Sequence, residues 1–126
     1  MKPLKKNNKR VFILKKNTSF KKIFSLGLSF SSGDIVLMAL FRAGELGLVN
    51  IGFAVAKRPS FNSVKKNRIK RLLKEAVLKN IGFVNENFSS GDYIVLYNGS
   101  YTPSSAKISH GVLSAFKKLA PNKLNT

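Results

Sequence analysis

The chain has 126 residues, a hydrophobic fraction of 44%, and 23 Lys and Arg against five Asp and Glu, giving a formal net charge of +18. This length and hydrophobic content suit one compact domain, and a charge of this size indicates a polyanionic partner. The sequence contains no run of about 18 apolar residues and so predicts no membrane-spanning helix, and the Lys-rich start lacks the apolar run of a secretory signal. The absence of Cys and the single His exclude disulfides, thiol catalysis and most zinc sites, so we expect a basic cytoplasmic protein.

The positive charge is concentrated in two segments. Residues 1–22 carry nine Lys or Arg and no acid, and residues 57–79 carry nine more with a single acid, Glu75. Like charges at this density destabilise the free fold unless a partner neutralises them, which favours polyanion binding over a merely solvated surface. We expect a single domain, 1–126, with three parts: a mobile basic arm at 1–10, a folded core at about 11–119 and a tail at 120–126.

The first half of the chain predicts one short helix and two strands. Phe20, Ile23 and Phe24 recur at helical spacing, so a helix begins near Phe20, is capped by Thr18 or Ser19, and ends at Gly27. The apolar runs at 34–41 and 49–56 are separated by turn-forming residues and predict an antiparallel hairpin. The second run alternates large residues with small ones, and its small side allows another layer to approach closely. The small side comprises Asn50, Gly52, Ala54 and Ala56.

The second half predicts two longer helices around one strand. The helix at 63–80 has an apolar stripe for the core and cations on its other side. Gly82 or the cluster at 85–87 separates it from a strand at 92–97, and a last helix spans about 105–119. The residues expected on the buried sides of the two helices are Ile69, Leu72, Leu73, Ala76, Val77, Ile108, Val112, Ala115, Phe116 and Leu119.

The residues that usually perform catalysis are scarce and scattered. No two of the five acids stand at a spacing that places both on one face of a helix or strand, and His110 has no acid near it in sequence. No Gly-x-Ser-x-Gly motif or phosphate-cradling glycine loop occurs. We therefore expect no catalytic residue and no metal ligand in this chain.

Residues for binding nucleic acid are abundant. Arg clamps phosphate through two hydrogen bonds, and Asn67, between Lys66 and Arg68, adds an amide donor and acceptor. Phe20 and Phe24 lie four residues apart and share one helix face, where unpaired bases would stack at about 1–3 kcal/mol each. Periodicity alone favours burial of both rings in the core, so the two interpretations stay open.

Longer motifs add a family resemblance. The segment Val64-Lys65-Lys66-Asn67-Arg68-Ile69-Lys70-Arg71 resembles the Ala-Val-x-Arg-Asn-Arg-x-Lys-Arg signature of the protein component of bacterial ribonuclease P. Three further segments resemble that family in order and spacing: Phe20-Lys21-Lys22-Ile23-Phe24 with Gly27, Gly52-Phe53-Ala54-Val55-Ala56-Lys57-Arg58, and Asp92-Tyr93-Ile94-Val95. The likeness covers almost the whole chain.

The resemblance implies an α+β fold, a small two-layer sandwich with a central mixed or antiparallel sheet, about three helices and a left-handed βαβ crossover. It implies a subunit of the ribonucleoprotein endonuclease that hydrolyses the 5′ leader from precursor tRNA. In that enzyme the RNA subunit performs the chemistry with Mg²⁺ held by RNA and substrate, and the protein binds both RNAs. The implied partners are the catalytic RNA, in a one-to-one complex, and precursor tRNA, with no DNA and no membrane.

The resemblance also implies two sets of site residues. The RNA-binding set comprises Lys57, Arg58, Lys66, Asn67, Arg68, Lys70, Arg71 and Lys74, and the substrate-leader cleft comprises Lys16, Phe20, Phe24 and Met38. Three departures from the family pattern fall here. Lys66 replaces an Arg and loses the bidentate fork, the linker from Arg58 to Val64 is about one residue longer, and Met38 replaces a sheet aromatic whose stacking a thioether replaces only in part.

Other functions remain open at this point. A ribosomal or assembly protein that binds structured RNA accounts for the charge but does not require an aromatic cleft. A protein-only nuclease would depend on His110 and cleave without an RNA partner. A membrane-surface role is disfavoured, because the cationic helix needs its apolar stripe for the core.

Overall fold

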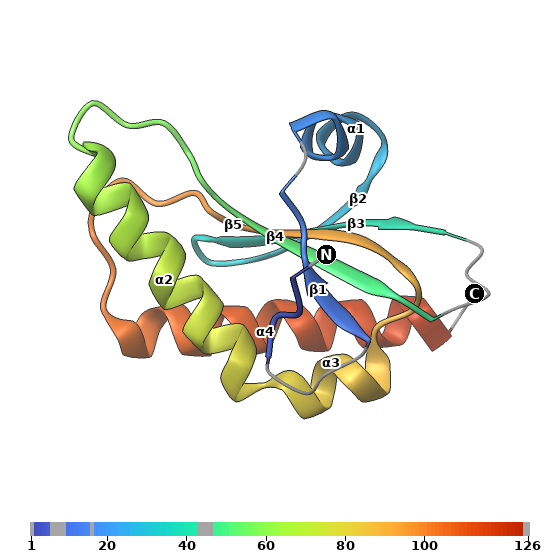
Figure 1. Cartoon of the computed structure of the whole chain (residues 1–126). Coiled ribbons are helices and arrows are strands. Elements are labelled where there is room, and N and C mark those ends of the chain that lie inside the picture. Colours follow the sequence, from blue (N-terminus) through green and yellow to red (C-terminus); the bar gives the residue numbers. More distant parts are fainter. Residues whose placement is uncertain (1, 6–9, 16, 43–46, 125–126) are drawn as a thin grey trace.

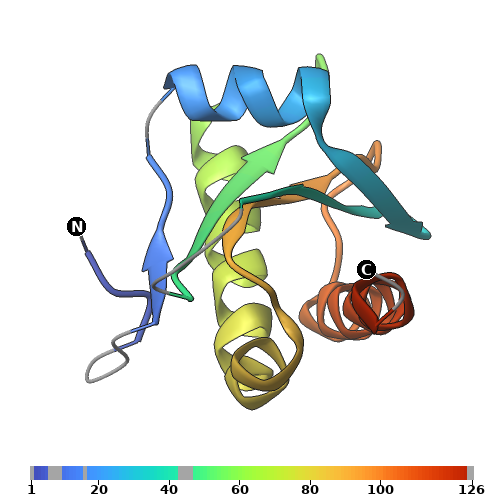
Figure 2. The same cartoon turned by 90° about the vertical axis from the view of Figure 1, so that its right-hand side faces the viewer.

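The computed structural model describes residues 2–5, 10–15, 17–42 and 47–124, with the side chains of 120–124 excepted. A five-stranded sheet carries α1 on one face and the other three described helices on the opposite face (Figures 1 and 2). The predicted α+β class is confirmed, with four helices in place of about three and with helices on both faces of the sheet. The elements are β1 (Val11–Ile13), α1 (Asn17–Leu26), β2 (Leu28–Ser32), β3 (Ile35–Phe41), β4 (Val49–Val55), α2 (Ser63–Lys79), α3 (Ile81–Asn87), β5 (Gly91–Tyr97) and α4 (Ser105–Leu124).

The strand order is β1-β4-β5-β3-β2, so the predicted hairpin between β3 and β4 is wrong. β5 lies between those strands, antiparallel to β3 and parallel to β4. The physical reason is that β5 is apolar on both faces: Tyr93, Ile94 and Val95 are fully buried, which only a central position provides. The hairpin that does form joins β2 to β3 through Gly33, whose φ of +58° favours glycine.

The main core lies between the sheet and the pair α2 and α4. The predicted stripes of both helices are buried there, except that Leu72 is half-buried. α2 begins where predicted, with the Asn62 side chain accepting a hydrogen bond from the Lys65 N–H at 2.9 Å. Two predictions fail near the helix ends. α3 occupies residues expected to form a connection, and α4 continues past Leu119 to Leu124, into the expected tail.

A smaller core lies under α1. Ile23 of α1 and Ile94 of β5 are both fully buried, and the Phe20 ring sits directly over Gly52 of β4. A Cβ atom at Gly52 would lie 2.4 Å from Cζ of Phe20, so the prediction that small residues admit a second layer is confirmed. α1 begins at Asn17, three residues before the expected start at Phe20.

The described part of the N-terminal arm packs beside β1. The Leu4 N–H donates to the Val11 carbonyl at 3.0 Å, the Ile13 N–H donates to the Lys2 carbonyl at 2.9 Å, and the Leu4 side chain is buried. The Arg10 guanidinium donates to the carbonyls of Asn85, at 2.7 Å, and Phe88, where α3 ends. The physical reason is that Leu4 supplies an apolar anchor and Arg10 satisfies carbonyls left open at a helix C-terminus.

Candidate nucleic-acid interface

A groove of about 860 Å³ lies between α2, the start of α1 and the outer edge of β4. Its lining combines residues from both of the charged segments. The cations that line it are Lys2, Lys15, Lys57, Lys66, Lys70, Arg71 and Lys74. The fold therefore brings two positive clusters, which the sequence separates by more than 30 residues, onto one concave surface suited to a polyanion.

The floor of the groove includes an open sheet edge. β1 covers β4 only along Val49–Ile51, and the last bond of that ladder runs from the Leu14 N–H to the Ile51 carbonyl at 2.9 Å. The N–H of Val49 also points toward β1, so by alternation the backbone groups of Phe53 and Val55 point the same way. β5 pairs with the inner side of Phe53 and Val55, but no described strand pairs with them on the outer side, and both residues line the groove. A ligand there meets backbone donors and acceptors beside the cations.

The sheet face under α1 forms the adjoining surface. Strand register places Met38, Ile94 and Gly52 in one row across that face, and Val36, Leu96 and Ala54 in the next. The first row lies beneath α1, because its Gly52 meets Phe20. All three residues of the second row are half-buried, and Ala54 lines the groove.

The predicted leader-cleft residues are only partly gathered by the fold. Phe20 lines the groove and is half-buried, so its ring serves both the small core and the open surface. Phe24 lies one turn further along α1 and is 47% exposed, far more than an ordinary core ring. Met38 belongs to the row under α1 and does not line the groove. Lys16 lies outside the described residues.

The predicted RNA-binding residues divide into three groups. Lys57, Lys66, Lys70, Arg71 and Lys74 line the groove. Asn67 and Arg68 are exposed on α2 outside it. Arg58 is already engaged: its guanidinium donates to the Asn98 carbonyl at 2.9 Å, to the Asn98 side-chain oxygen at 3.0 Å and to the Lys57 carbonyl at 2.9 Å. This clamp joins the segment after β4 to the segment after β5.

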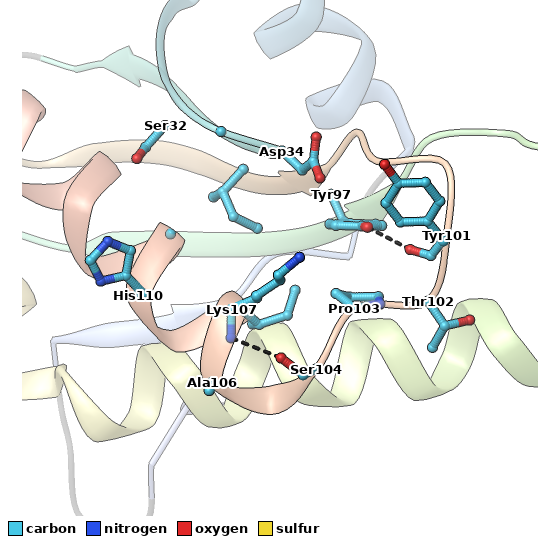
Figure 3. Close-up of a pocket in the computed structure, with 14 residues that line it drawn as sticks. Ser32, Asp34, Tyr97, Tyr101, Thr102, Pro103, Ser104, Ala106, Lys107 and His110 are labelled. Atoms are coloured by element: carbon cyan, nitrogen blue, oxygen red, sulfur yellow. Dashed lines mark hydrogen bonds between the residues drawn. The ribbon is translucent and has the colours of Figure 1, made fainter.

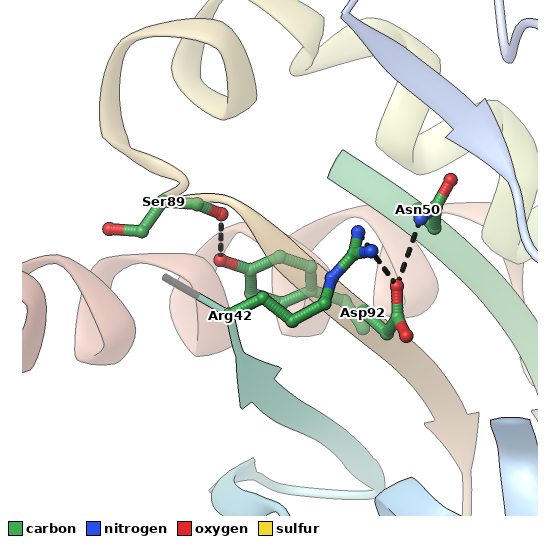
Figure 4. A network of polar contacts seen from close by, with 5 residues as sticks. Arg42, Asn50, Ser89 and Asp92 are labelled. Atoms are coloured by element: carbon green, nitrogen blue, oxygen red, sulfur yellow. Dashed lines mark hydrogen bonds and ion pairs between the residues drawn. The ribbon is translucent and has the colours of Figure 1, made fainter. Parts of the chain in front are cut away.

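The polar network at the other end of the sheet is structural (Figure 4). The Asp92 carboxylate lies 3.3 Å from the Arg42 guanidinium and accepts a hydrogen bond from the Asn50 side chain at 2.9 Å. The Tyr93 hydroxyl donates to the Ser89 carbonyl at 2.6 Å, and burial raises the pKa of Tyr93 well above its ordinary value. Across the ranges that the structure describes, no three His, Asp or Glu side chains gather as a metal-binding cluster.

Sequence reasoning missed part of this surface. Lys2 and Lys15 were assigned to a basic segment but not to the site, and nothing in their spacing indicated that they face α2. The open backbone edge at Phe53 and Val55 exists because β1 is too short to cover them, and the sequence of β1 does not indicate where that strand ends. The row containing Val36 and Leu96 depends on the pairing of β5, which was not predicted.

The sheet and every groove cation except Lys2 lie within the part of the chain that a family model matches. The family model for ribonuclease P matches residues 8–120. The chain belongs to the ribonuclease P family. A "Ribonuclease P protein component" from Natranaerobius thermophilus is 37% identical over 87 residues, which cover 69% of this chain and 70% of that protein. The protein of the same name from Clostridium kluyveri is 29% identical over 108 residues, which cover 86% of this chain and 94% of that protein.

Solved structures of ribonuclease P proteins share the fold. The Staphylococcus aureus RNase P protein superimposes with a TM-score of 0.69 at 22% identity, covering 86% of this chain and 96% of that one. The Thermotoga maritima RNase P protein gives a TM-score of 0.67 at 20% identity, covering 88% of this chain and 97% of that one. The arrangement of helices on a five-stranded sheet is therefore that of the ribonuclease P family.

Proposed function

We propose that this chain, the RNA-binding protein subunit of ribonuclease P, acts as a cationic bridge that holds precursor tRNA against the enzyme's RNA subunit. The RNA performs hydrolysis of the 5′ leader, and the protein contributes binding and position. The observation that carries the proposal is the convergence of seven cations from both charged segments on the groove between α1, β4 and α2. Neutralising phosphates at this density lets two polyanions approach each other.

The two sides of α2 suit two RNA contacts. Arg68 and Asn67 are exposed outside the groove, where they offer a bidentate clamp and an amide to the catalytic RNA. Lys66, Lys70 and Lys74 line the groove, where they would contact the RNA strand of the substrate. A single helix of 17 residues thus supports contact with catalyst and substrate together.

The surface between groove and α1 suits a single-stranded leader. Phe24 offers an exposed ring and Phe20 a partly exposed one, and stacking on such rings is tolerant of sequence because every base has an aromatic face. The open edge of β4 at Phe53 and Val55 adds donors and acceptors without side-chain selectivity. These features fit a leader whose sequence varies between tRNA precursors.

Mg²⁺ in this reaction is expected to be held by RNA and substrate. A protein Mg²⁺ site needs several converging oxygen ligands, and the described carboxylates are not gathered in that way. Asp92, moreover, is occupied by Arg42 and Asn50. We also expect a one-to-one complex with the catalytic RNA, in the cytoplasm; no helix among the described residues has the length and apolarity to cross a bilayer.

The test is reconstitution with the catalytic RNA at low Mg²⁺, using precursor tRNAs with short and long leaders. Arg68→Ala should weaken assembly with the RNA for every substrate, whereas Phe24→Ala should slow cleavage of long-leader substrates selectively. Lys117→Ala, an exposed cation on α4, is the control and should leave both unchanged. If the wild-type chain left leader removal unchanged, an assembly protein without a part in the reaction would be the better description.

A further inference from the structure

A second pocket lies away from the groove, on the α4 side of the sheet. It has a volume of about 740 Å³ and is enclosed by the β2–β3 turn, the segment after β5 and the first turns of α4 (Figure 3). Ile35, Pro103 and Ile108 supply apolar lining. Asp34 and Lys107 point into the space from opposite walls, and Tyr101 lies at one end of it with His110 at the other.

The walls of this pocket are fixed by close contacts. A Cβ at Gly99 would lie 2.1 Å from the Tyr97 hydroxyl oxygen and 2.9 Å from Oδ2 of Asp34, so only glycine admits both groups. The Tyr97 hydroxyl donates to the Tyr101 carbonyl at 2.5 Å, and the Asn98 N–H donates to the Asp34 carbonyl at 2.7 Å. The pocket therefore keeps its shape without a ligand.

The same contacts link this pocket to the RNA interface. Arg58, which follows β4 near the groove, donates to the carbonyl and side chain of Asn98, and the Asn98 N–H donates to Asp34. Phe61, just before α2, packs against Tyr97 with ring centroids 6.4 Å apart. The pocket wall at Tyr97 therefore contacts the segment that leads into α2.

We propose that this pocket binds one unpaired guanine of an RNA partner. The Tyr101 side chain is 71% exposed at the rim, where its ring can stack on a base. The Asp34 carboxylate, which has no hydrogen bond to the described residues, provides two acceptor oxygens for the adjacent N1–H and N2–H donors of guanine. Lys107 on the facing wall provides a donor for O6.

Guanine is favoured over the other bases by its hydrogen-bonding edge. Adenine, cytosine and uracil do not present two adjacent donors followed by an acceptor, so each would leave a group unpaired beside the Asp34 carboxylate or the Lys107 ammonium. The volume lies within the range of nucleotide-sized pockets and leaves room for the ribose beside Ser104 and Thr102. The inference presupposes that the chain binds RNA, but not that it binds the leader.

His110 makes the test direct, because it is the single histidine and lies at this pocket. The whole chain is titrated with GMP, AMP, CMP, UMP and inorganic phosphate while the His110 imidazole resonances are followed by NMR. We expect a saturable shift with GMP and about tenfold weaker binding of the other nucleotides. Asp34→Asn should remove that preference, and Tyr101→Ala should weaken binding of every nucleotide.

A matched pair separates the pocket from general charge. Lys107→Ala should weaken GMP binding, whereas Lys117→Ala, also exposed on α4, should not. Equal shifts with all four nucleotides, the same shift with phosphate alone, or a GMP preference that survives Asp34→Asn would overturn the inference. Phe24→Ala should leave GMP binding intact, so a failure here is distinguishable from a failure of leader binding in reconstituted enzyme.

Discussion

The salt dependence of RNA binding gives a quantitative test of the groove. Each phosphate contact on single-stranded RNA contributes about −0.7 to the slope of log K against log salt. If all seven cations that line the groove engage, the slope for a single-stranded leader is about −5. The double variant Lys70→Ala and Arg71→Ala removes two exposed contacts and should reduce the slope to about −3.5.

The assay is fluorescence anisotropy of a labelled leader RNA between about 50 and 400 mM salt, a range in which multi-contact complexes lose most of their affinity. The control is the double variant Lys79→Ala and Lys117→Ala, which removes the same net charge from exposed positions outside the groove. It should lower the affinity slightly and leave the slope near the wild-type value. Equal slopes for the two double variants would refute the assignment of binding to the groove and leave only a diffuse effect of net charge.

Three further predictions concern residues that shape the interface. Gly52→Ala should cost about 1–3 kcal/mol of unfolding free energy by displacing the Phe20 ring, whereas Gly82→Ala, where a Cβ meets nothing within 4 Å, should not destabilise; urea unfolding compares them. Arg58→Ala should lower the melting temperature more than Arg68→Ala, because only Arg58 clamps Asn98, and equal effects in thermal unfolding would contradict that role. Tyr93→Phe should cost about 1 kcal/mol at neutral pH through loss of the bond to Ser89. Burial raises the Tyr93 pKa in the folded state, so the contribution of this tyrosine to the unfolding free energy is full below the unfolded pKa of about 10 and declines above it. The difference in unfolding free energy between wild type and Tyr93→Phe, measured by urea unfolding, should therefore narrow from about pH 8 to about pH 10.5. A difference that stays constant over this range would contradict the burial of the neutral phenol.

The sequence predicted best what depends on local periodicity. The buried stripes of α2 and α4 repeat over several turns, so Ile69 and Phe116 were placed in the core without knowledge of their partners. Strand pairing is nonlocal, and the insertion of β5 between β3 and β4 could not be read from a turn-forming segment between two apolar runs. β1 has three residues and no clear alternation, so its packing on β4 was also missed.

In the candidate site, too, local motifs were predictable and nonlocal arrangements were not. The cations of α2 were identified from their motif, but their distribution between the groove and the outer surface depends on how α2 lies against β4. Lys2 lies at the groove because Leu4 anchors the arm beside β1, and Lys15 lies there because β1 and Leu14 pair with β4. Arg58 was predicted as an RNA ligand, and the structure adds that its donors already hold Asn98.

The central claim is that the polypeptide contributes no groups that make or break bonds. The most direct measurement follows cleavage of precursor tRNA at low Mg²⁺ by purified RNA-free protein, by the catalytic RNA alone and by the two together. The account predicts no cleavage with the protein alone, slow cleavage with the RNA and fast cleavage with both. Trimming of tRNA by the RNA-free protein, lost on His110→Ala, would contradict it.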